Sequence, residues 1–78
     1  MIKFREDLNI LELLKNAGYT TYVLRQRKYL SEVSIGHLRR GEMVSMDALN
    51  AICCMLHKKP QDIIEYVVTN EEKLKYYL

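Results

Sequence analysis

Hydrophobic residues between positions 20 and 41 recur at helical spacing in two short runs. This pattern predicts one helix over about residues 21–28 and a second over about residues 32–40, joined by a tight turn. Four apolar side chains of this stretch would face inward: Leu24, Leu30, Ile35 and Leu38. Thr20 and Ser31 are suitable N-cap residues for the two helices, and the glycine after the second is suited to end it.

A longer apolar run precedes this pair and predicts a helix over about residues 10–17. Its broad apolar face comprises Ile10, Leu11, Leu13, Leu14 and Ala17. Asp7 or Asn9 would cap the helix, and Asn9 with Glu12 has the spacing of a capping box, in which each side chain reaches the other residue's backbone N–H. Gly18 would end the helix in the left-handed conformation.

A further helix is predicted over residues 46–58, with Ser45 as its N-cap. One face of this helix is expected to join the core through Leu49, Ile52, Cys53 and Leu56. Pro60 can then start a short helical turn, because its missing N–H is not needed at the first helical position.

The two ends of the chain carry the patterns of strands. Residues 1–5 alternate apolar and charged side chains, and residues 65–68 are rich in β-branched and aromatic side chains. A strand this short needs a partner, so we expect the ends to pair in a small two-stranded sheet. The helical pattern of residues 70–78 indicates either a frayed helix or a docking segment. The chain would thus divide into a domain over residues 1–69 and a C-terminal tail.

The 78 residues suffice for one domain, and 49% hydrophobic with 28% charged residues is the balance of an ordinary globular chain. Cys53 and Cys54 diverge on the predicted helix, so we expect a small core residue and an exposed one rather than a redox pair. No Cys/His spacing indicates a metal site. Reduced thiols and a charged N-terminus without an apolar signal segment predict a cytoplasmic location. No apolar run approaches the roughly 20 residues of a membrane span.

Positive charge is concentrated on the central helix pair, although the net charge is only +2. Residues 25–40 hold five of the twelve Lys and Arg but one of the ten acidic residues. The five cations are Arg25, Arg27, Lys28, Arg39 and Arg40. Their placement on a helix pair favours contact with DNA phosphates over the alternative of a merely solvated face.

Four segments resemble, in their order and spacing, the Cro/CI-like (Xre-type) helix-turn-helix repressor domains, especially a short stand-alone branch. They are LLKNAGYTTYVLRQ, LSEVSIGHLRRGE, VSMDALNAICCML and PQDIIEYV, so the resemblance spans nearly the whole chain. It implies an all-α, five-helix, lambda-repressor-like DNA-binding domain with the terminal strand pair. In that family the third helix reads the major groove of double-stranded DNA, usually in a homodimer on a two-fold related site.

The resemblance also implies positions of DNA contact. Thr20 and Thr21 match the start of the first motif helix, which usually touches phosphate. The exposed start and outer face of the recognition helix are matched by Ser31, Glu32, Val33, Ser34 and His37. Arg39 and Arg40 match the basic end beside the DNA backbone, and Arg25 stands where the short branch often has arginine.

Several of these residues have alternative interpretations. Glu32 either accepts a hydrogen bond from cytosine N4 or only complements the helix dipole. His37 contacts a base edge or phosphate, or is an exposed residue with no role. Ser34 bonds to DNA or simply faces solvent. Tyrosines near the C-terminus form either a dimer surface or, in the case of Tyr66, part of the core: Tyr66, Tyr76 and Tyr77.

Three residues depart from the family pattern. Tyr29 stands where the turn usually has glycine, so either the turn is rebuilt or Tyr29 leaves the left-handed region. Gly36 lowers helix propensity by about 1 kcal/mol relative to alanine, and Glu32 places negative charge towards the DNA. These departures motivate an alternative function, a protein–protein interaction module of antitoxin-like or anti-repressor-like kind that keeps the fold without reading DNA.

The sequence thus predicts a sequence-specific DNA-binding transcriptional regulator. Lys and Arg contacts to phosphate would supply most of the affinity and make it salt-dependent. No paired acid–base set or glycine-rich phosphate loop indicates an enzyme, a cofactor or a small-molecule substrate. A chain this small makes few base contacts, so we expect a homodimer.

Overall fold

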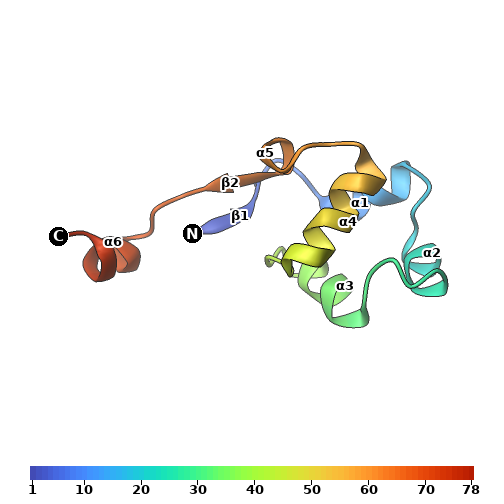
Figure 1. Cartoon of the computed structure of the whole chain (residues 1–78), viewed down its shortest axis with the longest axis horizontal. Helices are drawn as coiled ribbons and strands as arrows, with labels where there is room; N and C mark the ends of the chain where they lie inside the picture. Colours follow the sequence, from blue (N-terminus) through green and yellow to red (C-terminus); the bar gives the residue numbers. More distant parts are fainter.

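The computed structural model describes all 78 residues and contains six helices and two strands (Figure 1). In chain order these are β1 (Ile2–Phe4), α1 (Ile10–Asn16), α2 (Thr21–Gln26), α3 (Glu32–Arg39), α4 (Met46–Leu56), α5 (Pro60–Ile63), β2 (Ile64–Tyr66) and α6 (Asn70–Tyr76). The chain is mostly helical, as predicted, but it has six helices rather than five. None of them combines the length and the apolar composition needed to cross a lipid bilayer.

N-cap side chains begin the first four helices. In each, a side-chain oxygen accepts a hydrogen bond from the backbone N–H three residues later, which satisfies one of the unpaired donors of the first turn. The four pairs and their distances are Asn9 and Glu12 (3.1 Å), Thr20 and Val23 (3.3 Å), Ser31 and Ser34 (3.1 Å), and Ser45 and Ala48 (3.2 Å). These caps confirm the sequence prediction. At α1, however, Glu12 does not bond back to Asn9, so only half of the predicted capping box forms.

The same four helices end in one motif, in which a left-handed residue follows the helix and the next N–H bonds back over five residues. The left-handed residues are Gly18 (φ 96°), Lys28 (φ 57°), Gly41 (φ 71°) and His57 (φ 55°). Both glycines were predicted in this role. At α2 the N–H of Tyr29 bonds to the carbonyl of Leu24 at 3.0 Å. Lys28, rather than Tyr29, therefore takes the left-handed position, and the tyrosine avoids its strain.

Twelve apolar side chains form the core of the helical body, which we define as residues 4–63. They are Phe4, Ile10, Leu14, Leu24, Leu30, Ile35, Leu38, Ala48, Leu49, Ile52, Met55 and Ile63. All four residues predicted to face inward from the central pair are among them. Cys53 and Leu56 are only half-buried at its margin, and Ala17, expected on the apolar face of α1, is exposed because the helix ends before it.

The two ends of the chain pair, as predicted. β1 lies antiparallel to β2 with Ile2 opposite Tyr66 and Phe4 opposite Ile64. Backbone hydrogen bonds extend this pairing on both sides of the ladder. β2 begins at Ile64, one residue earlier than expected, because α5 runs directly into it.

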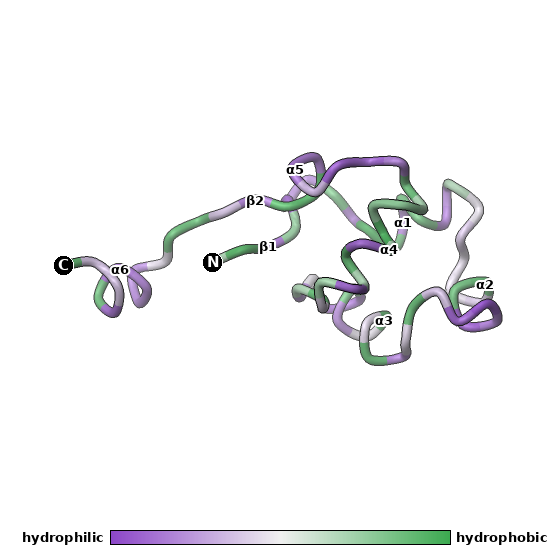
Figure 2. Tube along the Cα trace, in the orientation of Figure 1, coloured by the Kyte–Doolittle hydropathy of each residue, from purple (hydrophilic) through white to green (hydrophobic).

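The strand pair and α6 project from the helical body (Figure 1). We call residues 1–3 and 64–78 the terminal arm. The molecule measures 47 × 22 × 18 Å, and its radius of gyration of 13.8 Å exceeds the value of about 11.5 Å for a compact chain of this length. Figure 2 shows that apolar residues continue out along the arm. Tyr66 lies there with 67% of its surface exposed, so the core interpretation of this side chain is wrong.

Candidate nucleic-acid interface

α2 and α3 each bury one side in the core and leave the other side open. Leu24 and Ile35 are fully buried and fix the two helices to the body. The turn between them is exposed apart from Leu30, which is buried in the core. Of the side chains predicted to contact DNA, nine are exposed: Thr20, Arg25, Arg27, Lys28, Ser31, Glu32, Val33, Arg39 and Arg40. Thr21 and His37 are half-buried. One helix pair therefore displays nearly the whole predicted set.

Ser34 is the exception and corrects the sequence prediction. Its surface is only 8% exposed, and its hydroxyl lies 3.2 Å from that of Ser31, which donates to it. Ser34 precedes Ile35 and stands one turn before Leu38, so the helical period turns it towards the core despite its polar side chain. It is not available on the outer face of α3.

An ion pair links the two helices of the motif. The Nε of Arg25, near the end of α2, donates to a carboxylate oxygen of Glu32, the first residue of α3. Both side chains are exposed, so the pair contributes little to stability. Its electrostatic effect is more important, because Glu32 neutralises the charge of Arg25 beside the start of α3.

A second carboxylate, that of Glu42, bonds to two side chains at the basic end of α3. Its Oε1 lies 2.9 Å from His37 Nδ1 and 2.9 Å from Arg40 Nε. Hydrogen bonds from His37 and then Arg40 hold the pKa of Glu42 below its usual range. Gly36 lies under the Arg40 side chain, since a Cβ added there would stand 3.4 Å from Arg40 Nη1.

Sequence reasoning missed Glu42 as part of this surface. The signal was the glycine before it: the left-handed Gly41 reverses the chain, and the N–H of Glu42 then bonds to the carbonyl of His37 at 2.8 Å. A helix end that folds back in this way returns the following side chain to the last turn of the helix. When a helix with a basic last turn is followed by glycine and then by an acidic residue, that acidic side chain is therefore positioned to pair with the basic residues of the last turn.

Three cations of the predicted set have no carboxylate partner within salt-bridge distance: Arg27, Lys28 and Arg39. They lie at the end of α2, in the turn and at the end of α3. Positive potential that no carboxylate offsets is what a polyanion can use. These three side chains are thus the members of the predicted set whose charge no ion pair offsets.

Two exposed side chains on the same helices are not basic. Val33, in the first turn of α3, has 68% of its surface exposed, and Tyr22, in the first turn of α2, has 69%. An apolar side chain on an outward helix start can contact a thymine methyl group, and a tyrosine hydroxyl can bond to phosphate. Tyr22 was not selected from the sequence, although it stands directly after Thr21.

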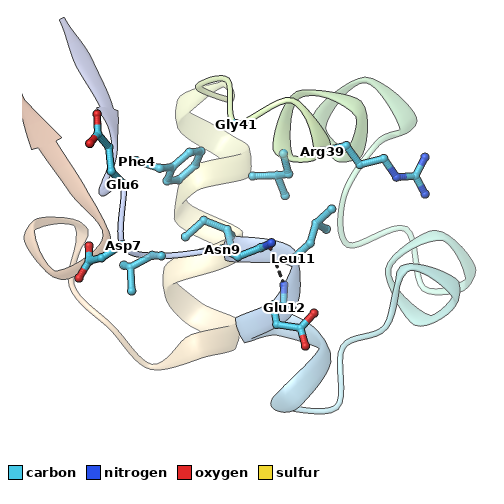
Figure 3. A pocket seen from close by; sticks show the side chains of 11 residues that line it. Phe4, Glu6, Asp7, Asn9, Leu11, Glu12, Arg39 and Gly41 are labelled. Carbon is cyan, nitrogen blue, oxygen red and sulfur yellow. Dashed lines mark hydrogen bonds between the residues drawn. The ribbon is translucent and has the colours of Figure 1, made fainter.

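A hollow of about 550 Å³ lies beside this surface, between the start of α1 and the end of α3 (Figure 3). Glu6, Asp7 and Glu12 line it together with Arg39. Figure 3 shows the Arg39 guanidinium pointing away from Glu6 and Asp7. The acidic rim would repel phosphate, so the hollow marks the boundary of the basic surface rather than part of it.

Neither the thiols nor the acids form a further site. Cys53 is half-buried and Cys54 exposed, and burial raises the pKa of the Cys53 thiol, which favours its unreactive protonated form. Nowhere do three or more His, Cys, Asp or Glu side chains converge as metal ligands would.

The comparisons with known proteins agree with this geometry. A family model described as the Cro/C1-type HTH DNA-binding domain matches residues 9–68, which include α1 to α5 and β2. The chain belongs to this family. No curated protein and no solved structure matches it. The resemblance noted in the sequence is thus confirmed at the level of the family.

Proposed function

We propose that this Cro/C1-type domain is a sequence-specific DNA-binding transcriptional regulator that places α3 in the major groove. The observation that carries the proposal is the open, basic outer face of α2 and α3. In this arrangement Arg27, Lys28 and Arg39 contact phosphates directly, because none of them is held in a salt bridge. Thr20 and Thr21 contact phosphate from the start of α2.

Base recognition falls to the exposed side chains at the start and middle of α3. Val33 offers an apolar contact to a thymine methyl group, and Glu32 an acceptor for cytosine N4. His37 and Arg40 reach the DNA only if they exchange Glu42 for a phosphate or a base edge, and Arg25 likewise has to leave Glu32. Ser31 serves as the cap of α3 and lies exposed at its entry. Two copies acting on a two-fold related site would supply the contacts that one α3 cannot.

The test is binding to mixed-sequence duplex DNA at several salt concentrations. Counterion release predicts that the logarithm of the binding constant falls linearly with the logarithm of the salt concentration. Arg39→Ala should weaken binding for all sequences and reduce the slope by about one unit. Lys58→Ala is the matched control, because this exposed lysine follows α4 and belongs to neither α2 nor α3, and it should leave the slope unchanged.

The carboxylates Glu32 and Glu42 give the alternative some support, since they neutralise part of the basic surface. A protein–protein interaction module would show no measurable binding to DNA even at low salt. Selection of bound sequences from random DNA separates the remaining cases. Enrichment of one motif supports the regulator, and binding without enrichment would contradict sequence-specific reading.

A further inference from the structure

The terminal arm exposes most of the surface apolar side chains of this chain. Eight of the twelve exposed large apolar residues belong to it: Met1, Ile2, Tyr66, Val67, Leu74, Tyr76, Tyr77 and Leu78. Leu74, in the middle of α6, has 88% of its surface exposed. Apolar residues gathered on one projection, rather than scattered singly, indicate an interaction surface.

α6 is well formed, yet outside its own cap the contact that holds it is the ion pair between the Met1 ammonium group and Glu72, at 2.7 Å. Its N-terminus is closed by a capping box, in which Thr69 Oγ1 accepts from the Glu72 N–H at 3.2 Å and Glu72 Oε1 accepts from the Thr69 N–H at 3.2 Å. No α6 residue is buried. A seven-residue helix is far below the 12–15 residues or so at which isolated helices become marginally stable, and a two-stranded sheet is marginal as well. The arm therefore requires a partner that covers it.

The charges of α6 identify a second copy of this chain as that partner. The helix begins with acids and ends with bases, so it is complementary to itself when turned end for end. Glu71 and Lys75 lie four residues apart on one side of the stripe formed by Leu74 and Tyr77. Around a two-fold axis, which makes an interface self-complementary, Glu71 of each copy faces Lys75 of the other.

The position of the arm suits this pairing. α6 lies at the end of the molecule farthest from α2 (Figure 1). Two copies joined there leave the outer faces of α2 and α3 uncovered in both. Association through the arm would supply the dimer that the proposed DNA-binding function calls for. This association does not depend on that function and can be tested without DNA.

We propose that two copies of this chain associate through their terminal arms, with the α6 helices antiparallel about a two-fold axis. Leu74 and Tyr77 form the apolar centre of the interface. Glu71 and Lys75 flank it and fix the antiparallel direction.

Sedimentation of the full chain over a range of concentrations tests the proposal. The wild-type chain should form a dimer, and Leu74→Glu should raise the dissociation constant at least about tenfold. Met46→Glu is the matched control, since Met46 is an exposed apolar residue at the start of α4 with 77% of its surface exposed. This control should dimerise like the wild type. Because α6 does not contribute to the core, Leu74→Glu should still unfold cooperatively in urea. Its midpoint should not depend on protein concentration, whereas that of the dimeric wild type should rise with concentration.

A charge exchange tests the antiparallel direction. Glu71→Lys and Lys75→Glu should each weaken the dimer by placing like charges opposite each other, and the double variant should restore it. A monomeric wild-type chain, or a dimer that survives Leu74→Glu, would overturn the proposal, as would a double variant no better than the single ones. Binding of a monomeric chain to lipid vesicles through α6 would assign the arm to a membrane surface instead. Salt-dependent DNA binding by a monomer would support the proposed DNA-binding function and would contradict dimerisation through the arm.

Discussion

At the scale of single residues, Lys28 and His57 hold conformations that suit glycine. Both occupy the left-handed position at a helix end, where the same motif at α1 and α3 uses Gly18 and Gly41. The left-handed region costs an L-residue roughly 1–2 kcal/mol. The chain keeps two side chains at this cost, and one of them, Lys28, is among the free cations of the proposed DNA surface.

His57→Gly should stabilise the chain by up to about 1 kcal/mol, because glycine removes the strain while adding some flexibility to the unfolded chain. His57 is exposed and its side chain forms no ion pair, so the substitution breaks no such interaction. Urea unfolding measures the gain. The control is His57→Ala, which removes the imidazole but keeps the Cβ, and it should bring no gain. Equal stabilisation by both variants would contradict the backbone explanation.

At the scale of the elements, the ion pair between Arg25 and Glu32 sets how much positive charge the helix pair presents. Arg25 belongs to α2 and Glu32 to α3, so one carboxylate controls a cation on the neighbouring helix. The pair is exposed, and breaking it should change stability little. Loss of this ion pair should therefore change the affinity for an anionic partner more than it changes the free energy of unfolding.

Glu32→Gln should therefore strengthen binding to mixed-sequence DNA and make the salt dependence steeper by about one unit, since Arg25 becomes free to contact a phosphate. Titrations of labelled duplex at several salt concentrations measure both quantities. The double variant Glu32→Gln with Arg25→Ala should lose the steeper slope. If the single variant binds DNA no better than the wild type, Arg25 does not reach the phosphates.

The elements also show what sequence patterns can and cannot predict. Helix ends are local: Thr20, Ser31 and Ser45 cap helices through residues three positions away, and each was found from the sequence. Ser34 was predicted on the outer face of α3 from its polar side chain, although its position in the helical repeat places it on the buried face. Glu42 was missed because its pairing depends on the reversal of the chain at Gly41. Errors arose where the outcome depended on tertiary direction rather than on neighbouring residues.

At the scale of the whole molecule, the sequence does not predict that the terminal arm projects from the helical body. The pattern of residues 70–78 indicates a helix, but nothing in it says whether that helix packs on its own core. Tyr66 illustrates this limit, since an aromatic residue in a strand is equally suited to a core and to an interface. Which cations of α2 and α3 lack a carboxylate partner was equally hard to predict, because it depends on the packed positions of Glu32 and Glu42.

Three carboxylates distributed over the molecule link its stability to pH. The pKa values of Glu6, Glu42 and Glu72 lie below the ordinary 4.5, owing first to hydrogen bonds from Lys3, His37 and the N-terminal ammonium group, respectively. Because the folded chain lowers these pKa values, their stabilising contributions are present above 4.5 and are lost as the pH falls through the folded values. The chain should become less stable on the acid side for this reason.

Glu42→Gln should reduce this acid effect, because the variant has no carboxylate to protonate at that position. The drop in urea midpoint between about pH 6 and about pH 3 should be smaller than in the wild type. Asp7→Asn is the control, since Asp7 is an exposed carboxylate without a cation partner. It should change the drop less than Glu42→Gln does. An identical drop in the Glu42 variant and the wild type would exclude Glu42 as a source of the pH dependence.

The pairing of β1 with β2 also orders events during synthesis. β1 leaves the ribosome first, whereas its partner, residues 64–66, is made after the whole helical body. Local helices form quickly, but contacts between distant parts of a chain wait until both parts exist. The nascent chain can therefore complete its helix-turn-helix while the arm is still unpaired. The association proposed through the arm would therefore follow the completion of the helix-turn-helix rather than precede it.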